Sequence, residues 1–271
     1  MNARTRDQLL ELNRIFYEAH AEAFDRSRGA RPWPGWQRLA ARLAGLSSET
    51  PAPPALPLPP SPPRDLGSVL DIGCGNGRFA CFLHEAGFRF RYTGVDANAA
   101  LLEAARRQLA VGPAAEARLI RHDFLAGGAP GAGLPAGPFE LIVLMGVLHH
   151  VPGAEGRLAL LRAATARLAR GGLLALAIWQ FADDPREARK RVAFASAGRV
   201  LGHSIDESQL EPGDALLRFG ADPTAPPRYC HAVTAAELES WPDALGLEPV
   251  DDYEDDGPHG RSNRYAVLRQ P

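Results

Sequence analysis

A glycine-rich segment at residues 71–78 is the part of the sequence best suited to hold a ligand. It reads Asp-Ile-Gly-Cys-Gly-Asn-Gly-Arg and ends a short apolar run. Glycine lets the backbone turn tightly and lets a ligand approach without meeting a Cβ atom. The segment joins a predicted strand to a predicted helix, so its N–H groups lie at a helix N-terminus, which favours an anion or another acceptor. We predict a nucleotide-binding loop with five contacts: Asp71, Gly73, Cys74, Gly75 and Gly77.

The glycine spacing argues against a dinucleotide. A dinucleotide fingerprint needs glycine at the first, third and sixth positions. The sixth position counted from Gly73 is Arg78. The pattern Asp-x-Gly-x-Gly-x-Gly instead resembles the first motif of the class I S-adenosylmethionine-dependent methyltransferases. The alternative is a glycine-rich turn that binds nothing.

Further candidate contacts follow at the ends of the next predicted strands. Asp96, followed by Ala97, lies about twenty residues after the glycines, where a carboxylate can accept hydrogen bonds from both ribose hydroxyls. Asp123 could accept from an adenine amino group while Phe124 covers the ring, although a carboxylate at a strand end is often only a turn former. The fourth strand ends in a turn that begins Met145-Gly146.

The periodicity from residue 68 onwards alternates strand and helix. We predict strands at 68–72, 90–95, 117–122, 139–145 and 172–179, and helices at 78–87, 98–110 and 155–170. A helix from Thr234 to Leu245 and an antiparallel pair at 247–253 and 263–268 follow. The fold class is therefore α/β, with a doubly wound, mostly parallel, seven-stranded, Rossmann-like sheet. Ligands of such sheets bind beyond the carboxyl ends of the strands.

The residues before this pattern form a predicted N-terminal helical cap, 1–50, followed by a proline-rich linker, 51–66. An amphipathic helix is expected at 5–26 and a short one at 37–46. Between them, Trp33 and Trp36 are held by prolines, either as a rigid connector or as part of a lid over the substrate. The methyltransferase domain is predicted at 67–271. Within it, residues 181–233 are too long for a plain connection and are interpreted as a lid insertion that contains a basic helix.

Several motifs in the right order identify residues 68–179 as similar to a class I methyltransferase. The flanking segments, which include Arg31-Pro-Trp-Pro34, Gly146-Val-Leu-His-His150 and Arg228-Tyr-Cys-His231, are similar to the tRNA wobble-uridine carboxyl methyltransferases and their bacterial relatives. This resemblance implies S-adenosylmethionine as cofactor, a tRNA acceptor and a small activator protein as partner. Cys230 departs from the family pattern, in which a second aromatic residue commonly precedes the histidine.

The acceptor decides which side chains the chemistry needs. A carboxylate is already ionised at neutral pH, so it needs only a cationic or hydrogen-bonding clamp. The clamp candidates are Arg26, Arg28, Arg228, Tyr229 and His231. A phenol or amine would instead need His149 or His231 to accept a proton. Three functions follow: a carboxylate methyltransferase acting on tRNA, a small-molecule O- or N-methyltransferase, and a non-catalytic methyltransferase-like subunit.

Composition limits the partners. The 271 residues carry a formal net charge of −2, which gives no general attraction to polyanions, and five acids fall within residues 251–256. We expect no DNA partner, and tRNA would have to approach from the arginine-rich side. The three cysteines show no metal-ligand spacing, so we predict reduced thiols and no metal. With no apolar signal region or membrane span, we expect a soluble cytoplasmic protein.

Overall fold

A seven-stranded sheet forms the centre of the protein in the computed structural model, which describes residues 1–28, 32–45, 64–110, 117–220, 222 and 224–271. Its strand order is β3-β2-β1-β4-β5-β10-β9. The bounds are β1 Arg64–Ile72, β2 Phe88–Asp96, β3 Ala117–Arg121, β4 Phe139–Met145, β5 Leu168–Trp179, β9 Glu248–Asp255 and β10 Asn263–Arg269. The predicted fold class is confirmed.

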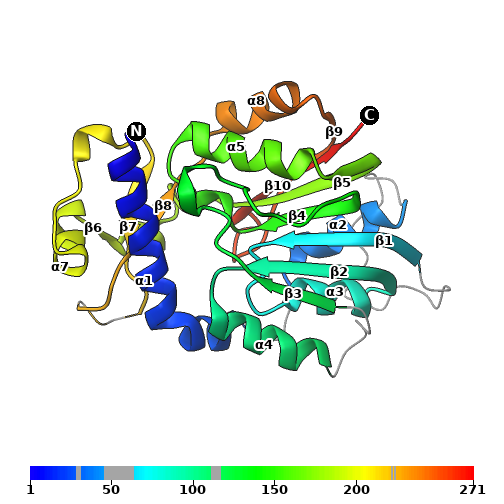
Figure 1. The fold of residues 1–271 in the computed structure, drawn as a ribbon, viewed down its shortest axis with the longest axis horizontal. Coiled ribbons are helices and arrows are strands. Elements are labelled where there is room, and N and C mark those ends of the chain that lie inside the picture. Colours follow the sequence, from blue (N-terminus) through cyan, green and yellow to red (C-terminus); the bar gives the residue numbers. More distant parts are fainter. Residues whose placement is uncertain (29–31, 46–63, 111–116, 221, 223) are drawn as a thin grey trace.

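Strand direction places the predicted site residues at one edge of this sheet. Strands β1 to β5 run parallel, and β10 lies antiparallel between β5 and β9. The carboxyl ends of the five parallel strands therefore meet on the side that faces helix α1, Ala3–Arg28 (Figure 1). The glycine loop, Asp96, Asp123 and the turn after β4 all leave the sheet there.

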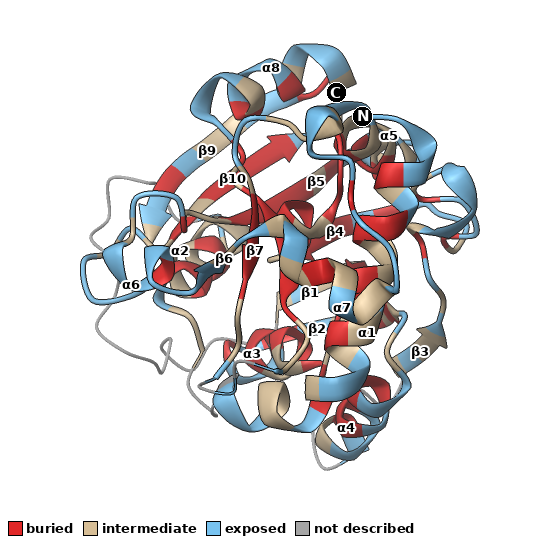
Figure 2. Cartoon of the chain, turned by 90° about the vertical axis from the view of Figure 1, so that its left-hand side faces the viewer, coloured by how far each residue is buried: buried red, intermediate tan, exposed pale blue. Residues whose placement is uncertain are grey.

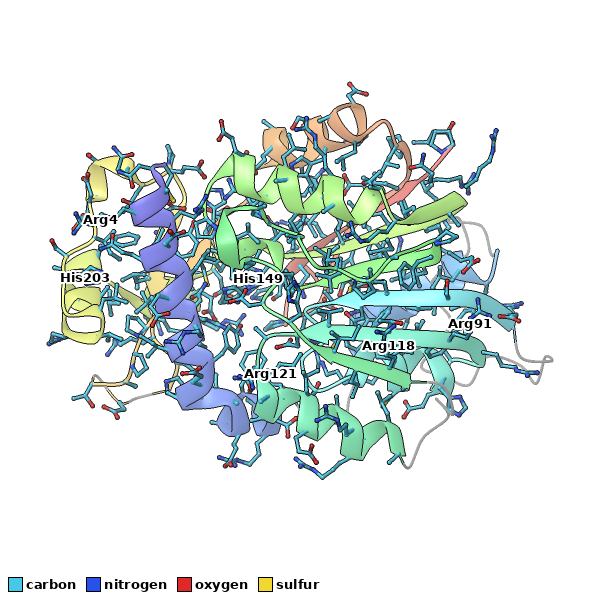
Figure 3. The ribbon with its side chains drawn as sticks, in the orientation of Figure 1. Arg4, Arg91, Arg118, Arg121, His149 and His203 are labelled. Carbon is cyan, nitrogen blue, oxygen red and sulfur yellow. The ribbon has the colours of Figure 1, made fainter. Side chains whose placement is uncertain are left out.

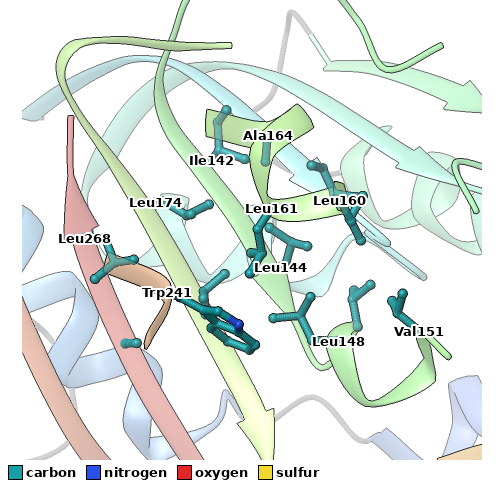
Figure 4. Packing of buried hydrophobic residues seen from close by; sticks show 14 of the residues in the cluster. Ile142, Leu144, Leu148, Val151, Leu160, Leu161, Ala164, Leu174, Trp241 and Leu268 are labelled. Atoms are coloured by element: carbon teal, nitrogen blue, oxygen red, sulfur yellow. The ribbon is translucent and has the colours of Figure 1, made fainter. Parts of the chain in front are cut away.

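Helices cover both faces of the sheet. On one face, α5 (Ala154–Thr165) and α8 (Ala235–Leu245) bury apolar side chains against β4, β5 and β10, and Trp241 and Leu161 lie among them (Figure 4). On the other, α2 (Pro34–Leu43) packs beside β9 and β10, while α3 (Arg78–Glu85) packs on β2 and α4 (Ala99–Ala110) on β2 and β3. Because Trp36 and Leu39 of α2 belong to this second core, α2 is part of the layer on the sheet and not of a separate cap.

A small antiparallel sheet, in the order β6-β7-β8, stands beside the carboxyl edge of the large one. Its strands are β6 Arg191–Val192, β7 Asp214–Leu217 and β8 Arg228–His231. Leu9 and Leu12 of α1 pack with Leu216 and Tyr229 of this sheet in a separate apolar cluster. Figure 2, drawn from this side, shows α1 and the small sheet in front of the buried strands. Helix α1 and the small sheet together cover the carboxyl edge.

The structure corrects several predicted boundaries. β1 begins at Arg64, so residues 64–66 are strand and not linker, while 51–63 lie outside the described residues. α5 ends at Thr165, and 168–170 belong to β5 because a bulge lets Leu168 pair with Phe139 before Gly171. The predicted basic helix is two single turns, α6 (Pro185–Ala188) and α7 (Gly198–Leu201), separated by β6. Asp184 caps α6 and pairs with Arg186, which favours a short turn.

The remaining predictions for the C-terminal part are confirmed. Thr234 caps α8 by accepting from the Glu237 N–H at 3.1 Å, and the closing strands pair antiparallel.

The three cysteines are free thiols. Among the helices that the structure describes, none has the length and apolar character needed to cross a membrane.

Candidate active site

A cavity of about 460 Å³ lies at the carboxyl edge of the large sheet, between the strand ends and α1. Its size is that of a small-molecule binding site. Figure 3 shows His149, one of its lining residues, between α1 and the strand ends. Eleven of the residues predicted from the sequence line it: Asp71, Gly73, Cys74, Gly75, Asp96, Asp123, Phe124, Met145, Gly146, His149 and Arg228.

The glycine loop has the geometry that its sequence predicts. Gly73, Gly75 and Gly77 all have positive φ, at 76°, 55° and 76°. A Cβ atom at Gly73 would lie 2.5 Å from Val147 Cγ2, whereas one at Gly75 would meet no protein atom within 4 Å. Gly75 lines the cavity, so a side chain there would occupy ligand space. Gly77 does not line the cavity; it caps α3, and its Cβ would lie 3.1 Å from Ala105.

Three carboxylates line the end of the cavity beside β1, β2 and β3. Asp96 accepts from the N–H groups of Gly75 and Asn98, both at 2.8 Å, which holds the glycine loop against the end of β2. Burial raises the pKa of Asp96, and these bonds oppose the rise. Asp123 accepts from the Leu125 N–H at 3.0 Å. Each carboxylate oxygen can accept more than one hydrogen bond, so Asp96 and Asp123 can still accept bonds from a ligand.

Asp71 is the most buried of the three. Its Oδ2 accepts from the Tyr92 hydroxyl at 2.8 Å, while Oδ1 has no hydrogen-bond partner among the described residues. Burial raises the pKa of Asp71 to about 7, the Tyr92 bond opposes this, and nearby Asp96 adds to it. A buried carboxylate oxygen without a partner is costly, so this end of the cavity suits a cationic or hydrogen-bond-donating ligand.

The turn after β4 lies beside the glycine loop and continues the cavity lining to His149 and Trp179. Gly146 has φ 81°, and a Cβ there would lie 3.6 Å from Trp33. His149 is buried, and its ring lies 4.1 Å from that of His150 and 5.4 Å from that of Trp179 between centroids. His150 Nε2 lies 2.7 Å from the hydroxyl oxygen of Tyr17, which belongs to α1. The helix over the cavity is thus joined to the turn beneath it.

Arg228, from β8, contributes a buried cation to the same end. Its side chain is only 7% exposed, and its guanidinium carbon lies 4.7 Å above the Trp179 ring and 5.6 Å from the Phe16 ring centre. Arg228 Nε has no hydrogen-bond partner within the described part of the chain. Among the residues that the structure describes, no acidic side chain forms an ion pair with it. A buried cation without a counter-ion, facing a cavity, favours an anionic ligand.

The other predicted residues lie outside the cavity lining. Ala97 sits in the turn between β2 and α4. Arg26 is exposed and pairs with Glu22 on α1 at 3.6 Å. Arg28 ends α1, and its side chain lies outside the described part of the chain. Among the clamp candidates whose side chains the structure describes, Arg228 alone lines the cavity.

Tyr229 and His231 belong instead to a buried network behind the cavity. The Tyr229 hydroxyl and His231 Nδ1 both bond to Asp214 Oδ1 at 2.7 Å. Arg157, from α5, is bonded to Glu237 at 2.6 Å and to Glu211 at 2.9 Å. Burial would lower the pKa of His231, but its bonds to Asp214 and Glu237 outweigh this and raise it. The network joins the small sheet to α5 and α8.

Some lining residues escaped the sequence prediction. They are Asn13, Arg14 and Tyr17 of α1, Arg78 of α3, Trp179 of β5, and Asp256 and Asn263 near the β9–β10 turn. Trp33 and Trp36 also line the cavity, and a lid over the substrate was one of the two interpretations that the sequence offers for them. The Arg78 guanidinium carbon lies 4.6 Å and 4.8 Å from the centres of the Trp33 and Trp36 rings. No local pattern marks Asn13 or Tyr17, because helical periodicity identifies a buried face but not what covers it.

Two groups of described residues have the composition of a metal site. One, Glu211, Asp214 and His231, belongs to the buried network behind the cavity. In the other, candidate ligand atoms of His149, His150 and Cys230 lie within 4.8 Å of one another. Burial raises the pKa of the Cys230 thiol to about 12, which disfavours the thiolate that a metal requires. His150 uses Nδ1 to bond the Tyr229 carbonyl at 3.0 Å and Nε2 to bond Tyr17. This second group therefore matches a packed hydrogen-bond network better than a metal centre.

Comparison with known proteins adds the following relatives. A model described as "methyltransferase domain" matches residues 35–251, a span that begins within α2. Trans-aconitate 2-methyltransferase from Streptomyces avermitilis is 35% identical over 202 residues, which cover 70% of this chain and 71% of that protein. Ribosomal RNA small subunit methyltransferase C from Yersinia enterocolitica is 34% identical over 123 residues, which cover 44% of this chain and 33% of that protein.

Solved structures agree on the fold. A methyltransferase from Methanosarcina mazei superimposes with a TM-score of 0.52 at 20% identity, covering 75% of this chain and 92% of its own. Another, from Clostridium acetobutylicum, gives a TM-score of 0.51 at 14% identity, covering 76% and 84%. At these identities the likeness concerns the fold alone.

Proposed function

Because the chain belongs to the class I S-adenosylmethionine-dependent methyltransferases, we propose that it transfers the methyl group to the carboxylate of a small organic acid. The reaction class and the cofactor come with the family. The acceptor is inferred from the end of the cavity where Arg228 and Trp179 lie.

The residues present fit the cofactor. The open side of Gly75 leaves room for it, and Asp96 and Asp123 would accept bonds from its ribose and adenine. The unpartnered Oδ1 of Asp71 would receive its ammonium group. When bound, the cofactor supplies a methyl group on a positively charged sulfur.

Arg228 carries the proposal for the acceptor. A buried guanidinium without a carboxylate partner costs free energy, which a carboxylate ligand would offset through charge-assisted hydrogen bonds. The Trp179 and Phe16 rings hold its side chain in place. Arg14 also lines the cavity, but it already pairs with Glu11 and Glu18 on α1.

The chemistry asks for positioning more than for proton transfer. A carboxyl group has a pKa of about 4, so the acceptor is ionised at neutral pH and needs no base. The enzyme must hold the acceptor oxygen about 3 Å from the methyl carbon, in line with the bond that breaks. Arg228 would fix the carboxylate, and α1 would exclude water from above. We therefore expect His149→Ala to change the rate by less than about threefold, because no proton has to be accepted.

The relatives support a small acceptor. The name of the Streptomyces relative specifies trans-aconitate, a small carboxylic acid, and that protein is matched over 71% of its length. The carboxylate of a modified tRNA wobble uridine, suggested by sequence resemblance, would use the same chemistry. It is the less favoured acceptor because the ribosomal RNA enzyme is matched over only 33% of its length and the chain has a net charge of −2. A small activator protein remains a prediction.

The test uses the purified chain and cofactor labelled in the methyl group. Small carboxylic acids, including trans-aconitate, are compared with matched amides, phenols and amines, and with total tRNA. Mild alkali then separates the products, because methyl esters release labelled methanol while methyl ethers and methylamines do not.

The proposal predicts alkali-labile label in a small acid and none in the matched amides. Alkali-labile label in tRNA alone would transfer the activity to the wobble-uridine acceptor. Alkali-stable label would replace the carboxylate by a phenol or an amine. Adding extract from the source organism, freed of small molecules, tests whether an activator protein is required.

A further inference from the structure

Three aromatic rings, those of Trp179, His149 and Trp33, form a continuous wall beside Arg228. The Arg228 guanidinium carbon lies 4.7 Å above the centre of the Trp179 ring, and the His149 ring lies 5.4 Å from that of Trp179 between centroids. A Cβ atom at Gly146 would lie 3.7 Å from His149 Cε1 and 3.6 Å from Trp33 Cη2, so these two rings flank the same backbone turn. All these residues line one cavity. This aromatic wall therefore begins at the cation that we propose for the acceptor.

The aromatic wall faces open space in the cavity. Trp33 and Trp179 are each only half-buried, although both belong to the cavity lining. A Cβ atom at Gly146 would meet no described side chain within 4 Å other than those of Trp33 and His149. Accessible ring surface within a cavity gains free energy when an apolar group covers it, and a second ring adds a favourable ring–ring contact. The wall is therefore suited to a ligand that carries an aromatic ring.

One small ligand can contact both Arg228 and the aromatic wall, because the guanidinium lies directly over a ring of that wall. A carboxylate that accepts hydrogen bonds from a guanidinium lies about 2.8 Å from its nitrogen atoms. The Trp179 ring centre is 4.7 Å from the guanidinium carbon, so the group attached to that carboxylate starts beside this ring. A link of one or two carbon atoms between carboxylate and ring is therefore sufficient.

The charges of the cavity suit an acid with one carboxylate. Three arginines line it, together with four aspartates, three of them beside β1, β2 and β3 and the fourth Asp256. The cofactor would add one net positive charge, so bases and acids would only balance. Arg14 is also paired with Glu11 and Glu18, and Asp256 lies within electrostatic reach of Arg78. A second carboxylate on the acceptor would therefore have no cation of its own, which is costly in a buried site.

We propose that the acceptor is a monocarboxylic acid that bears an aromatic ring, whose carboxylate binds Arg228 and whose ring packs on the aromatic wall. This inference rests on the proposed function and narrows its substrate class. It also distinguishes this chain from an enzyme for trans-aconitate, a tricarboxylic acid without a ring. Such an acid would leave the wall uncovered and would bring two carboxylates for which the cavity has no cation.

The experiment compares acids that differ by one group, with alkali-labile methyl transfer giving kcat/KM for each. Phenylacetate is compared with acetate, which lacks the ring, and with 4-carboxyphenylacetate, which adds a carboxylate. Likewise, 3-phenylpropionate is compared with propionate and with 3-(4-carboxyphenyl)propionate, and trans-aconitate is added to both series. In the wild-type enzyme we expect at least one phenyl acid to exceed its two partners and trans-aconitate by about tenfold or more, because burial of a phenyl group strengthens binding by roughly 10- to 100-fold.

Trp179→Leu tests the wall itself. It removes the ring next to Arg228, so the ratio of the phenyl acid to its ring-free partner should fall by about threefold or more, without a change in affinity for S-adenosylhomocysteine. If Trp179 only supported Arg228, both acids would lose rate equally and the ratio would stay the same. Phe90→Leu is the matched control and should keep the wild-type ratio, because Phe90 is a half-buried ring of β2 that does not line the cavity.

Three results would overturn the inference. Methylation of trans-aconitate, the ring-free acids or the dicarboxylates as fast as the phenyl acids would contradict it while leaving the proposed function intact. So would a preference for the phenyl acid that is unchanged in Trp179→Leu. Absence of alkali-labile product from every acid would remove both the proposed function and the inference. Calorimetry with S-adenosylhomocysteine shows that each variant is folded, and the wild-type ratios decide the question even if Trp179→Leu does not fold.

Discussion

Arg228 and Asp71 are the two charged side chains on which the chemistry of the cavity depends most. Each is buried, and each has a polar atom without a hydrogen-bond partner among the described residues. Asp71 lies beside the glycine loop, where we expect the cofactor. Arg228 lies beside Trp179, where we propose that the acceptor binds. Burial makes each interaction with a ligand of opposite charge stronger than it would be at the surface. We therefore expect their substitutions to act on different ligands.

Arg228→Gln should weaken acceptor binding and leave the cofactor site intact. Loss of charge-assisted hydrogen bonds worth about 1.5–3 kcal/mol lowers kcat/KM for the acid by roughly 10- to 100-fold, mainly through KM. Arg228→Lys should be intermediate, because lysine keeps the charge but not the fork of donors. Steady-state methyl transfer measures these effects. Arg26→Gln is the control, since Arg26 is exposed on α1. An equal loss of S-adenosylhomocysteine affinity would contradict this assignment.

Asp71 should make cofactor binding depend on pH. Its pKa of about 7 means that the carboxyl binds a proton at lower pH, and an ammonium ligand favours the ionised form. Affinity for S-adenosylhomocysteine should therefore rise between about pH 5.5 and 7, by at most tenfold per pH unit, with release of a proton. Calorimetry in two buffers of different ionisation enthalpy measures this release. Asp71→Asn should bind S-adenosylhomocysteine more weakly, with an affinity that does not change with pH. If the wild-type affinity is equally independent of pH, Asp71 does not have this role.

The sequence predicts the elements of the large sheet, but it does not predict the short strands that carry Arg228 and its neighbours. The strands and helices of the large sheet follow from local periodicity, since each repeats an apolar pattern over enough residues to be recognised. Strands β7 and β8 each span only four residues within 181–233, a segment for which the sequence predicts a lid insertion with a basic helix and no strand. Their pairing with each other and with β6, and the packing of α1 against them, makes them strands.

Arg157 should be the residue on which the attachment of the small sheet depends. Its guanidinium is 1% exposed and bonds Glu237 of α8 and Glu211 before β7. Arg157→Met would remove the guanidinium from two partly buried carboxylates, leaving Glu237 only its contact with His231, and should lower the free energy of unfolding by about 3–5 kcal/mol. Denaturant unfolding measures the change. Arg162→Met, on the exposed face of α5, is the control and should change stability by less than about 0.5 kcal/mol.

The loss of stability caused by Arg157→Met should become smaller at low pH. Burial would raise the pKa of Glu237, but its bonds to His231 and Arg157 outweigh this and lower it. A lowered carboxyl pKa contributes stability above the unfolded value of about 4.3, and this contribution is lost as the pH falls through the folded pKa. The difference between Arg157→Met and the wild type should therefore shrink on acidification below about pH 4. A difference that grows on acidification would show that Glu237 is not the partner that matters.

At the scale of the whole molecule, charge is distributed in a way that disfavours polyanions. The net charge is −2. Several basic side chains of the lid are already engaged, since Arg186 pairs with Asp184 and Lys190 with Glu187. The acidic run near the C-terminus lies largely in β9, where Asp251 pairs with Arg38 of α2. Asp251 thus helps to hold α2 to the sheet.

We expect the chain alone to bind total tRNA with a dissociation constant no tighter than about 10⁻⁵ M at physiological salt, the range of non-specific electrostatic binding. Filter binding across salt concentrations measures this. A protein known to bind tRNA specifically is the positive control. Binding tighter than about 10⁻⁷ M, with protection of Arg186 to Arg199 from modification, would instead favour the tRNA acceptor.

The local sequence was enough to predict the glycine loop, the order of the main strands along the chain and the resemblance to a methyltransferase. Each depends on a few consecutive residues, such as three glycines after a buried strand, whose backbone requirements are the same in any surroundings. The acceptor end of the cavity required the folded chain. Tyr17 meets His150 across 133 residues, and Asn13 meets Tyr229 across 216. Such contacts arise from the packing of α1 against β8, and an amphipathic pattern specifies that a face is buried without specifying its partner.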